Sequence, residues 1–331
     1  MNRSRNLRRI GLASLLVVLG AGPALAVRRT EEPLALVPAS AVTVGVVHWS
    51  ELRASPLAAK VFADVDKMSS DGDAARFLAD TGLTPREDVD TVVIAMSPGG
   101  GPGRSDSGLV LFEGRFDLTR IASALTSRGA LRHASANGDY YRLFEKDGSG
   151  GEERGAVALV NRGLIVCGHE EAVVAALARK ESGGAGGLTS GQGIGRYLAR
   201  IDRDASAWAL VDLSRMPASH REGAEGEPAQ ALFGAMKSVS LLAVQAVVHG
   251  DSVDLSATGL SGDEENRNLI ADSLRGMLAM WRLAVSEKSP ELVSVLRRFQ
   301  IDSDGEGVSI RGTLPGSFLR ALSANGRAAK N

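Results

Sequence analysis

The sequence contains a single cysteine and few aromatic residues, and both shortages limit what the protein can do. Its 331 residues include one Cys, three Trp, three Tyr and eight Phe. Because Cys167 has no second cysteine to pair with, no disulfide can form within the chain, and stability has to come from packing. Cys167 lies in the apolar run GLIVCG, where a cysteine is typically a small buried hydrophobe rather than a nucleophile.

Local signatures of catalysis and metal binding are also missing. The sequence has no H-E-x-x-H, no G-x-S-x-G and no serine three residues before a lysine, and its five histidines are scattered. The stretch Asp302 to Gly305 resembles the start of a calcium loop but lacks the later ligands, so a hairpin turn is favoured. We therefore assign no catalytic residue, no metal site and no cofactor.

The charge balance argues against nucleic acid as a partner. The chain has 38 basic and 39 acidic residues, and four of the basic ones lie within the first 26 residues, which hold no acid. Removal of that segment leaves 34 basic against 39 acidic residues, a net charge of −5. An acidic chain with scattered charges is also a poor ligand for an anionic membrane.

Residues 1–26 have the pattern of a secretory signal peptide. Four arginines precede an apolar run, which ends on Ala24-Leu25-Ala26. The apolar run is shorter than the roughly 20 residues that a membrane span needs. We expect cleavage after Ala26, export to the periplasm or the medium, and no membrane span in the mature chain. An uncleaved anchor is the alternative.

The rest of the chain alternates strand-like and helix-like stretches and predicts two related units. The expected divisions are a first unit at 27–182, a Gly/Ser-rich linker at 183–195, a second unit at 196–325 and a frayed tail at 326–331. Glycine landmarks recur at an almost constant spacing, as Gly114 and Gly259 do at an offset of 145 residues.

Short turns between neighbouring strands indicate the class of fold. A strand that returns through a two- or three-residue turn must pair antiparallel with the strand before it. The sequence therefore predicts an α+β fold, with two tandem, pseudo-repeated units of antiparallel sheet and helices packed on one face.

The stretch GGLTSGQGIGRYLARI (186–201) places glycines before a helical pattern, as a phosphate-binding loop would. No strand precedes it, and Arg196 stands where the last glycine of a dinucleotide fingerprint belongs. The preceding run ESGGAGGLTS is polar and of flexible composition. We interpret the stretch as the linker between the two units.

Four stretches of the mature chain carry a resemblance. They are the opening Leu36-Val37-Pro38-Ala39-Ser40-Ala41, the segment GLIVCGHEEAVVAAL, the strand AWALVDL and the closing FQIDSDGEGVSIRGTLP. In these the chain resembles a loose group of uncharacterised secreted bacterial proteins, domains of unknown function with that opening and that closing hairpin. The resemblance implies an exported α+β protein and assigns no catalytic residue.

One set of polar and aromatic residues predicts a ligand site. His48 and Asp212 stand at equivalent strand ends, Trp49 and Trp208 lie close to them in sequence, and a pseudo-twofold packing of the units could bring them together. The alternative is that Asp212 caps the next turn and His48 is a satisfied residue at a strand end.

The function that follows is an exported, non-enzymatic binding or interaction module with a protein partner in the cell envelope. Long loops on a well-formed scaffold are common binding elements. The alternatives are a small-molecule binder or hydrolase that uses a cleft between the two units, and a purely structural role. The oligomeric state stays open.

Overall fold

The computed structural model describes residues 31–53, 55, 57, 72–98, 107–146, 152–216, 238–286 and 290–319. The predicted signal peptide (1–26) and the predicted tail (326–331) lie outside these residues, so the structure does not test them. Among the described helices, none is both long and apolar enough to cross a membrane.

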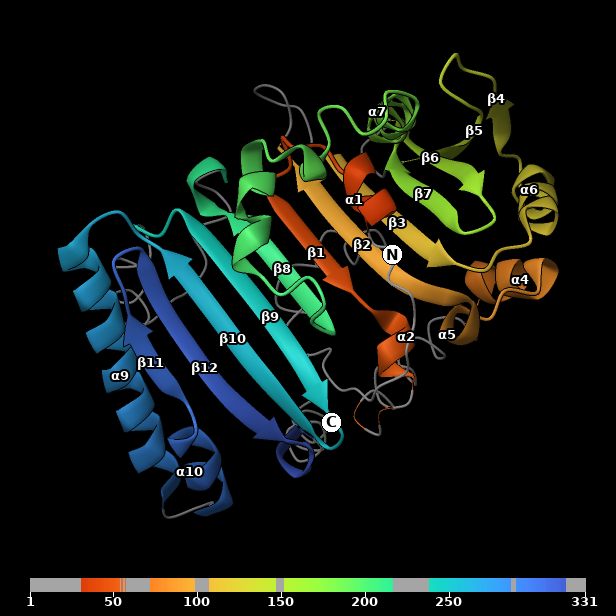
Figure 1. The fold of residues 1–331 in the computed structure, drawn as a ribbon. Coiled ribbons are helices and arrows are strands. Elements are labelled where there is room, and N and C mark those ends of the chain that lie inside the picture. Colours follow the sequence, from red (N-terminus) through yellow and green to blue (C-terminus); the bar gives the residue numbers. More distant parts are fainter. Residues whose placement is uncertain are drawn as a thin grey trace.

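The described strands form one antiparallel sheet of 12 strands, in the order β11-β12-β10-β9-β8-β1-β2-β3-β7-β6-β5-β4 (Figure 1). The strands are β1 (Thr43–Val47), β2 (Val89–Ser97), β3 (Ser107–Gly114), β4 (Leu131–His133), β5 (Tyr140–Lys146), β6 (Glu152–Asn161), β7 (Leu164–His169), β8 (Ala207–Asp212), β9 (Leu241–His249), β10 (Ser252–Leu260), β11 (Gln300–Ser303) and β12 (Gly307–Pro315). The predicted α+β class is therefore confirmed.

The described helices are α1 (Glu31–Leu36), α2 (Trp49–Leu52), α4 (Gly72–Thr81), α5 (Pro85–Asp88), α6 (Leu118–Ser127), α7 (Glu170–Glu181), α9 (Glu264–Ser286) and α10 (Pro290–Arg297), with 3-10 helices η3 (Leu188–Ser190), η4 (Gly193–Arg200) and η5 (Leu213–Arg215). α6 has a side-chain cap, because Asp117 accepts hydrogen bonds from the backbone of Thr119 and Arg120.

One face of the sheet carries the largest core and is called here the η4 face. Its side chains include the fully buried Val44, Val46 and Leu210. α1, η3, η4 and α7 supply the covering residues, among them Leu188 and Ile194. In Figure 1 these elements lie in front of the sheet, while no described helix lies over this face of β9, β10 and β12.

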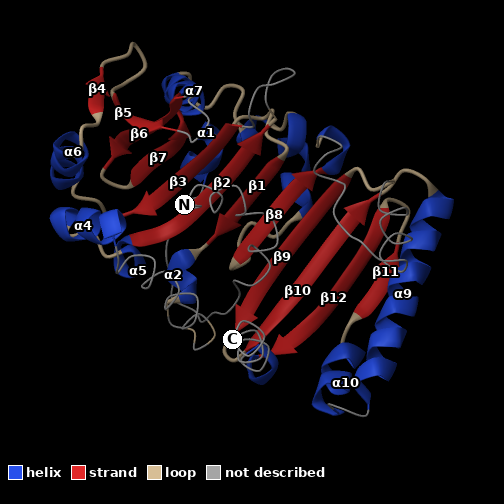
Figure 2. Ribbon diagram, turned by 180° about the vertical axis from the view of Figure 1, so that it is seen from behind, coloured by secondary structure: helices blue, strands red, loops and turns tan. Residues whose placement is uncertain are grey.

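The opposite face, called here the α6 face, also carries helices. α4 and α6 cover β3, β6 and β7 through a cluster that contains Ile121, Leu125 and Ile165. α9 and α10 cover β11 and β12 through a cluster that contains Ile270 and Ile301. Figure 2 shows the sheet from behind, with α4 and α9 at its two ends. The prediction that helices pack on one face is therefore wrong. The strands carry apolar side chains on both faces of the sheet, and helices cover parts of each face.

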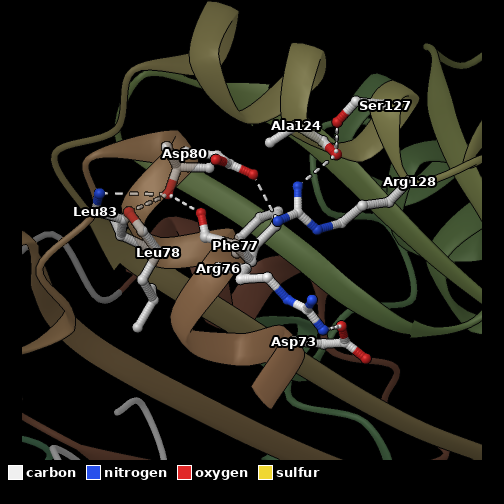
Figure 3. A network of polar contacts seen from close by, with 10 residues as sticks. Asp73, Arg76, Phe77, Leu78, Asp80, Leu83, Ala124, Ser127 and Arg128 are labelled. Atoms are coloured by element: carbon white, nitrogen blue, oxygen red, sulfur yellow. Dashed lines mark hydrogen bonds and ion pairs between the residues drawn. The ribbon is translucent and has the colours of Figure 1, made fainter. Parts of the chain in front are cut away.

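Polar contacts hold α4 against α6 (Figure 3). Arg128 donates to the carboxylate of Asp80 at 2.6 Å and to the carbonyl of Ala124 at 3.2 Å, and its guanidinium lies 5.4 Å from the centre of the Phe77 ring. Thr81 is the last residue of α4, and its hydroxyl donates to the carbonyls of Phe77 and Leu78. This corner is thus fixed by one arginine shared between two helices.

The glycine-rich stretch predicted as a flexible linker is packed. Leu188 and Ile194 are fully buried, and the backbone of Leu188 bonds to the carbonyl of Val37 at 2.8 Å. A Cβ atom added at Gly187 would lie 2.0 Å from the Ala35 carbonyl oxygen, and one at Gly195 would lie 2.0 Å from the Leu188 oxygen. Two of the glycines therefore serve close backbone contact and not flexibility.

Strand prediction succeeds for the long β-branched runs and misses the short or irregular elements. The runs at 89–96, 107–116, 164–167, 238–250 and 251–260 predict strands, and β2, β3, β7, β9 and β10 begin and end within a few residues of these limits. The sequence does not predict β4 and α1, because they are short and their contacts with the rest of the chain define them.

Replacement of Gly187 by alanine tests the packing of the glycine-rich stretch. Because the new methyl group would overlap the backbone at Ala35, we expect Gly187→Ala to lower the free energy of unfolding by about 1–3 kcal/mol, measured by urea denaturation. Gly262→Ala is the control, since its Cβ would meet nothing within 4 Å. Equal losses in the two variants would contradict this account.

Candidate functional site

The two polar residues predicted to meet, His48 and Asp212, lie at opposite ends of the β1–β8 pair. Gly45 pairs with Ala209 in the centre, and each predicted site residue lies three residues beyond one of these two. Because the strands run antiparallel, His48 lies opposite Ser206, which is six residues from Asp212 along the chain. The two predicted residues are therefore about 20 Å apart. The structure therefore does not bring them together.

The two positions are nevertheless equivalent in their backbone contacts. His48 donates its backbone N–H to the carbonyl of Ser206 at 2.9 Å, and Asp212 donates its own to the carbonyl of Val42 at 2.7 Å. His48 precedes α2 with φ −79° and ψ 83°, and Asp212 precedes η5 with φ −83° and ψ 90°. Each residue thus ends a central strand and precedes a short helical turn, and neither side chain makes a capping hydrogen bond to that turn.

Side-chain contacts give both residues a local partner. The imidazole Nε2 of His48 lies 3.0 Å from the carbonyl oxygen of Arg203. Asp212 accepts from the Ser214 hydroxyl at 2.5 Å and from Arg215 at 2.7 Å. Burial alone would raise the pKa of Asp212, but these hydrogen bonds and the charge of Arg215 outweigh it, so the pKa lies below its ordinary value.

The two tryptophans lie on different faces of the sheet. Trp208 is 2% exposed and belongs to the core of the η4 face, whereas Trp49 is half-buried and packs against the α6 cluster. The indole N–H of Trp208 is buried with no hydrogen-bond partner among the described residues. The four predicted residues are therefore not gathered in one cleft, and ligand binding by them stays a prediction.

A pocket of about 570 Å³ opens on the η4 face, beside η4. Its lining consists of Arg196, Ala199 and Arg200 from η4, Leu241 and Ala243 from β9, and Thr258 and Leu260 from β10. The sheet residues are mainly apolar, while the two arginines stand on the helical side. All seven residues come from the range predicted as the second unit, so this pocket is not a cleft between the units.

The two arginines differ in their charge partners. Arg200 forms an ion pair with Glu306, in the turn between β11 and β12, and this hydrogen bond raises the pKa of its guanidinium. Arg196 is exposed and makes no ion pair within the described part of the chain; its guanidinium lies 4.7 Å from the centre of the Tyr197 ring. Arg196 is thus the cation available to an incoming anion.

Sequence reasoning missed this pair of arginines. It treated Arg196 only as a departure from a nucleotide-binding motif. Arg196 and Arg200 in GRYLAR were a usable signal, because they are polar positions of a helical pattern whose apolar positions include Ile194 and Leu198.

Other titratable clusters serve the fold. Glu170, at the start of α7, accepts a hydrogen bond from the Tyr140 hydroxyl at 2.7 Å and from Arg142 at 2.8 Å, and the Tyr140 ring stacks on His133 at 5.5 Å. The hydrogen bond to Glu170 is the main cause of the raised pKa of Tyr140. These contacts join β4 and β5 to α7.

Cys167 has neither a metal site nor an activating partner. Burial raises the pKa of its thiol to about 12, which keeps it protonated at neutral pH. His169 accepts a hydrogen bond from the backbone of Gly108. Within the described ranges, no three His, Cys, Asp or Glu side chains are grouped so that they could hold a metal ion.

Replacement of Asp212 tests its structural role through pH. A carboxyl group with a lowered pKa stabilises the folded state above its unfolded pKa, near 3.9, and this stabilisation is lost as the pH falls through the folded pKa. We expect Asp212→Asn to cost about 1.5–3 kcal/mol of unfolding free energy at pH 7 and less below pH ~4. Asp73→Asn, at an exposed pair, is the control. A loss at Asp212 that does not change with pH would contradict the assignment.

Comparisons with known proteins give a distant structural likeness. No protein-family model matches the chain, and no curated protein matches it. Crystal forms I, III and IV of TP0453, a Treponema pallidum protein, are 8%, 9% and 10% identical to it, with TM-scores of 0.43, 0.46 and 0.42. The alignments cover 88% of this chain and 97%, 97% and 96% of the TP0453 chains. The chain is thus distantly similar in structure to TP0453, and nothing about its activity follows from this likeness.

Proposed function

We propose that the protein is an exported, non-enzymatic binding protein and that the pocket beside η4 is its ligand site. The observation that carries this proposal is a free cation above an apolar floor: Arg196 stands beside Leu241 and Leu260 without an acidic partner in the described chain. The ligand class that fits is a small molecule with an apolar body and a carboxylate or phosphate group.

The contacts of η4 make the pocket a stable feature of the fold. Ile194 and Leu198 anchor η4 in the main core, so its opposite side is held at a fixed distance from β9 and β10. The Arg200–Glu306 ion pair ties the end of η4 to the turn of the β11–β12 hairpin. Preorganised walls reduce the entropy lost on binding.

The composition of the pocket supports binding rather than hydrolysis. Its seven lining residues include no His, Asp, Glu, Cys or Ser. A general base or an activated nucleophile needs one of these groups, or a lysine or tyrosine, within hydrogen-bond reach of the substrate. Thr258 is the only hydroxyl in the lining, and no base stands beside it there.

The two-unit organisation is part of the proposal. Strand order outward from the central pair is β1-β2-β3-β7-β6 on one side and β8-β9-β10-β12-β11 on the other, and the first side continues with β5 and β4, which have no counterpart. Gly45 pairs with Ala209, and His48 and Asp212, which the sequence sets at equivalent strand ends, each lie three residues beyond this pair. This pseudo-twofold relation supports an internal repeat, and the sequence of residues 1–26 supports export.

Binding of decanoate to the purified chain, measured by isothermal titration calorimetry, tests the ligand site. Loss of the rim cation should weaken binding of the anion, and we expect Arg196→Gln to raise the dissociation constant about ten-fold, with Arg76→Gln on exposed α4 unchanged. Thr258→Trp should fill the pocket and abolish binding.

The neutral analogue decanol separates charge recognition from apolar adsorption. It should bind at least about ten-fold more weakly than decanoate to the unsubstituted chain and should not distinguish Arg196→Gln from it. Equal binding of decanoate to the unsubstituted chain and to both pocket variants would refute the site.

A further inference from the structure

α9 carries a line of exposed apolar residues along its outer side. Leu269, Met280 and Leu283 are 54%, 56% and 74% exposed, and with Gly276 they form what is called here the α9 stripe. At 100° per residue, these positions fall within about 40° of Gly276 around the helix axis. Ile270 and Leu278 on the opposite side pack into the protein core.

Gly276 is not explained by the fold of the chain itself. It lies in the middle of a helix of 23 residues, where glycine destabilises the helix relative to alanine. A Cβ atom added there would meet nothing within 4 Å, so no intramolecular contact requires the small residue. A glycine flanked by large apolar residues on an exposed helix face fits the close approach of a second helix.

Charges beside the stripe favour a protein partner over a lipid surface. The side chain of Asp272 is 74% exposed and lies about 40° from Gly276 around the helix axis, with Arg275 bonded to it at 3.0 Å. Burial of a carboxylate in hydrocarbon is strongly unfavourable. At a protein interface, the same ion pair can stay hydrated at the rim.

We propose that α9 packs antiparallel against α9 of a second copy of this chain. An antiparallel pair centred on the Ser273–Gly276 segment places Leu269 of each copy against Met280 of the other, with the small residues of both copies between them. Asp272 of each copy then lies on the same flank as Arg275 of the other, about two residues or 3 Å from it along the helix axis. The stripe is therefore complementary to itself in size and in charge, which a twofold interface requires.

The size of the surface sets the strength of the dimer. A helix of 23 residues is about 35 Å long, and its pairing alone buries an area at the low end of specific interfaces. α9 stands at one end of the molecule with its outer side away from the sheet (Figures 1 and 2), so two copies can approach without a clash between their sheets. We expect a concentration-dependent dimer rather than a permanent one.

Sedimentation equilibrium of the purified chain measures the dimer. Gly276→Leu should raise the dissociation constant about ten-fold or more, because the added side chain separates the two helices. Gly276→Leu also makes the stripe more apolar and improves helix propensity. A dimer held only by nonspecific hydrophobic contact would therefore become tighter in this variant. Leu131→Glu, at an exposed apolar residue of β4, is the control and should change nothing.

Cysteine crosslinking determines the direction of the pair. Gly276→Cys should form a disulfide-linked dimer, because each copy of this position lies near the twofold axis. Leu283→Cys alone should not, since its two copies would be about 25 Å apart, beyond the roughly 7 Å that a disulfide spans. Cys167 gives little background because burial raises the pKa of its thiol to about 12.

Three results would overturn the proposal. One is a monomer at every concentration up to about 100 µM, since a weaker dimer would not assemble at ordinary protein levels. Another is efficient crosslinking through Leu283→Cys alone. The third is a monomer that binds phosphatidylcholine vesicles through the stripe, shown by loss of binding in Leu283→Glu, which would assign the surface to lipid.

Discussion

The antiparallel pairing of β1 with β8 is the contact on which the rest of the structure depends. It joins five strands that include β8 to seven that include β1, so that one sheet extends through the described chain. Val44, Val46 and Leu210 are fully buried along this seam. Because η4 follows the glycine-rich stretch directly and leads into β8, the same pairing also sets η4 beside β9 and β10, where the pocket opens.

Local sequence patterns were sufficient for the strands but not for the side on which each helix packs. Alternating or continuous β-branched runs, such as Val89 to Met96, specify extended structure by themselves. The face that a helix covers depends on the register of strands distant in sequence, which no local window contains. The same limit explains His48 and Asp212: their equivalence was visible in the sequence, but the antiparallel direction of the central strands separates them.

The candidate site could not be predicted for a related reason. Glycine is common both in flexible linkers and where two backbones touch, and composition does not distinguish the two uses. In this chain Gly187 and Gly195 make backbone contacts, which anchor the segment that carries Arg196. The value of Arg196 as a ligand group depends on the absence of a nearby acid in the described fold, whereas Arg200 has Glu306. The backbone contacts of the glycines and the charge partners of the arginines both depend on the tertiary structure, which a local stretch of sequence does not specify.

The pocket and the α9 stripe lie on opposite faces of the sheet, the pocket over β9 and β10 and α9 over β11 and β12. Leu241, Ala243 and Leu260 present the pocket floor on the η4 face, while α9 packs on the α6 face against Ile301 and Val308. A second copy docked on the outer side of α9 therefore leaves the pocket open, so ligand binding and dimer formation can be measured independently. Any coupling between ligand binding and dimer formation has to pass through β10 and β12. In a closely packed sheet such coupling is carried by contacts between the side chains on its two faces.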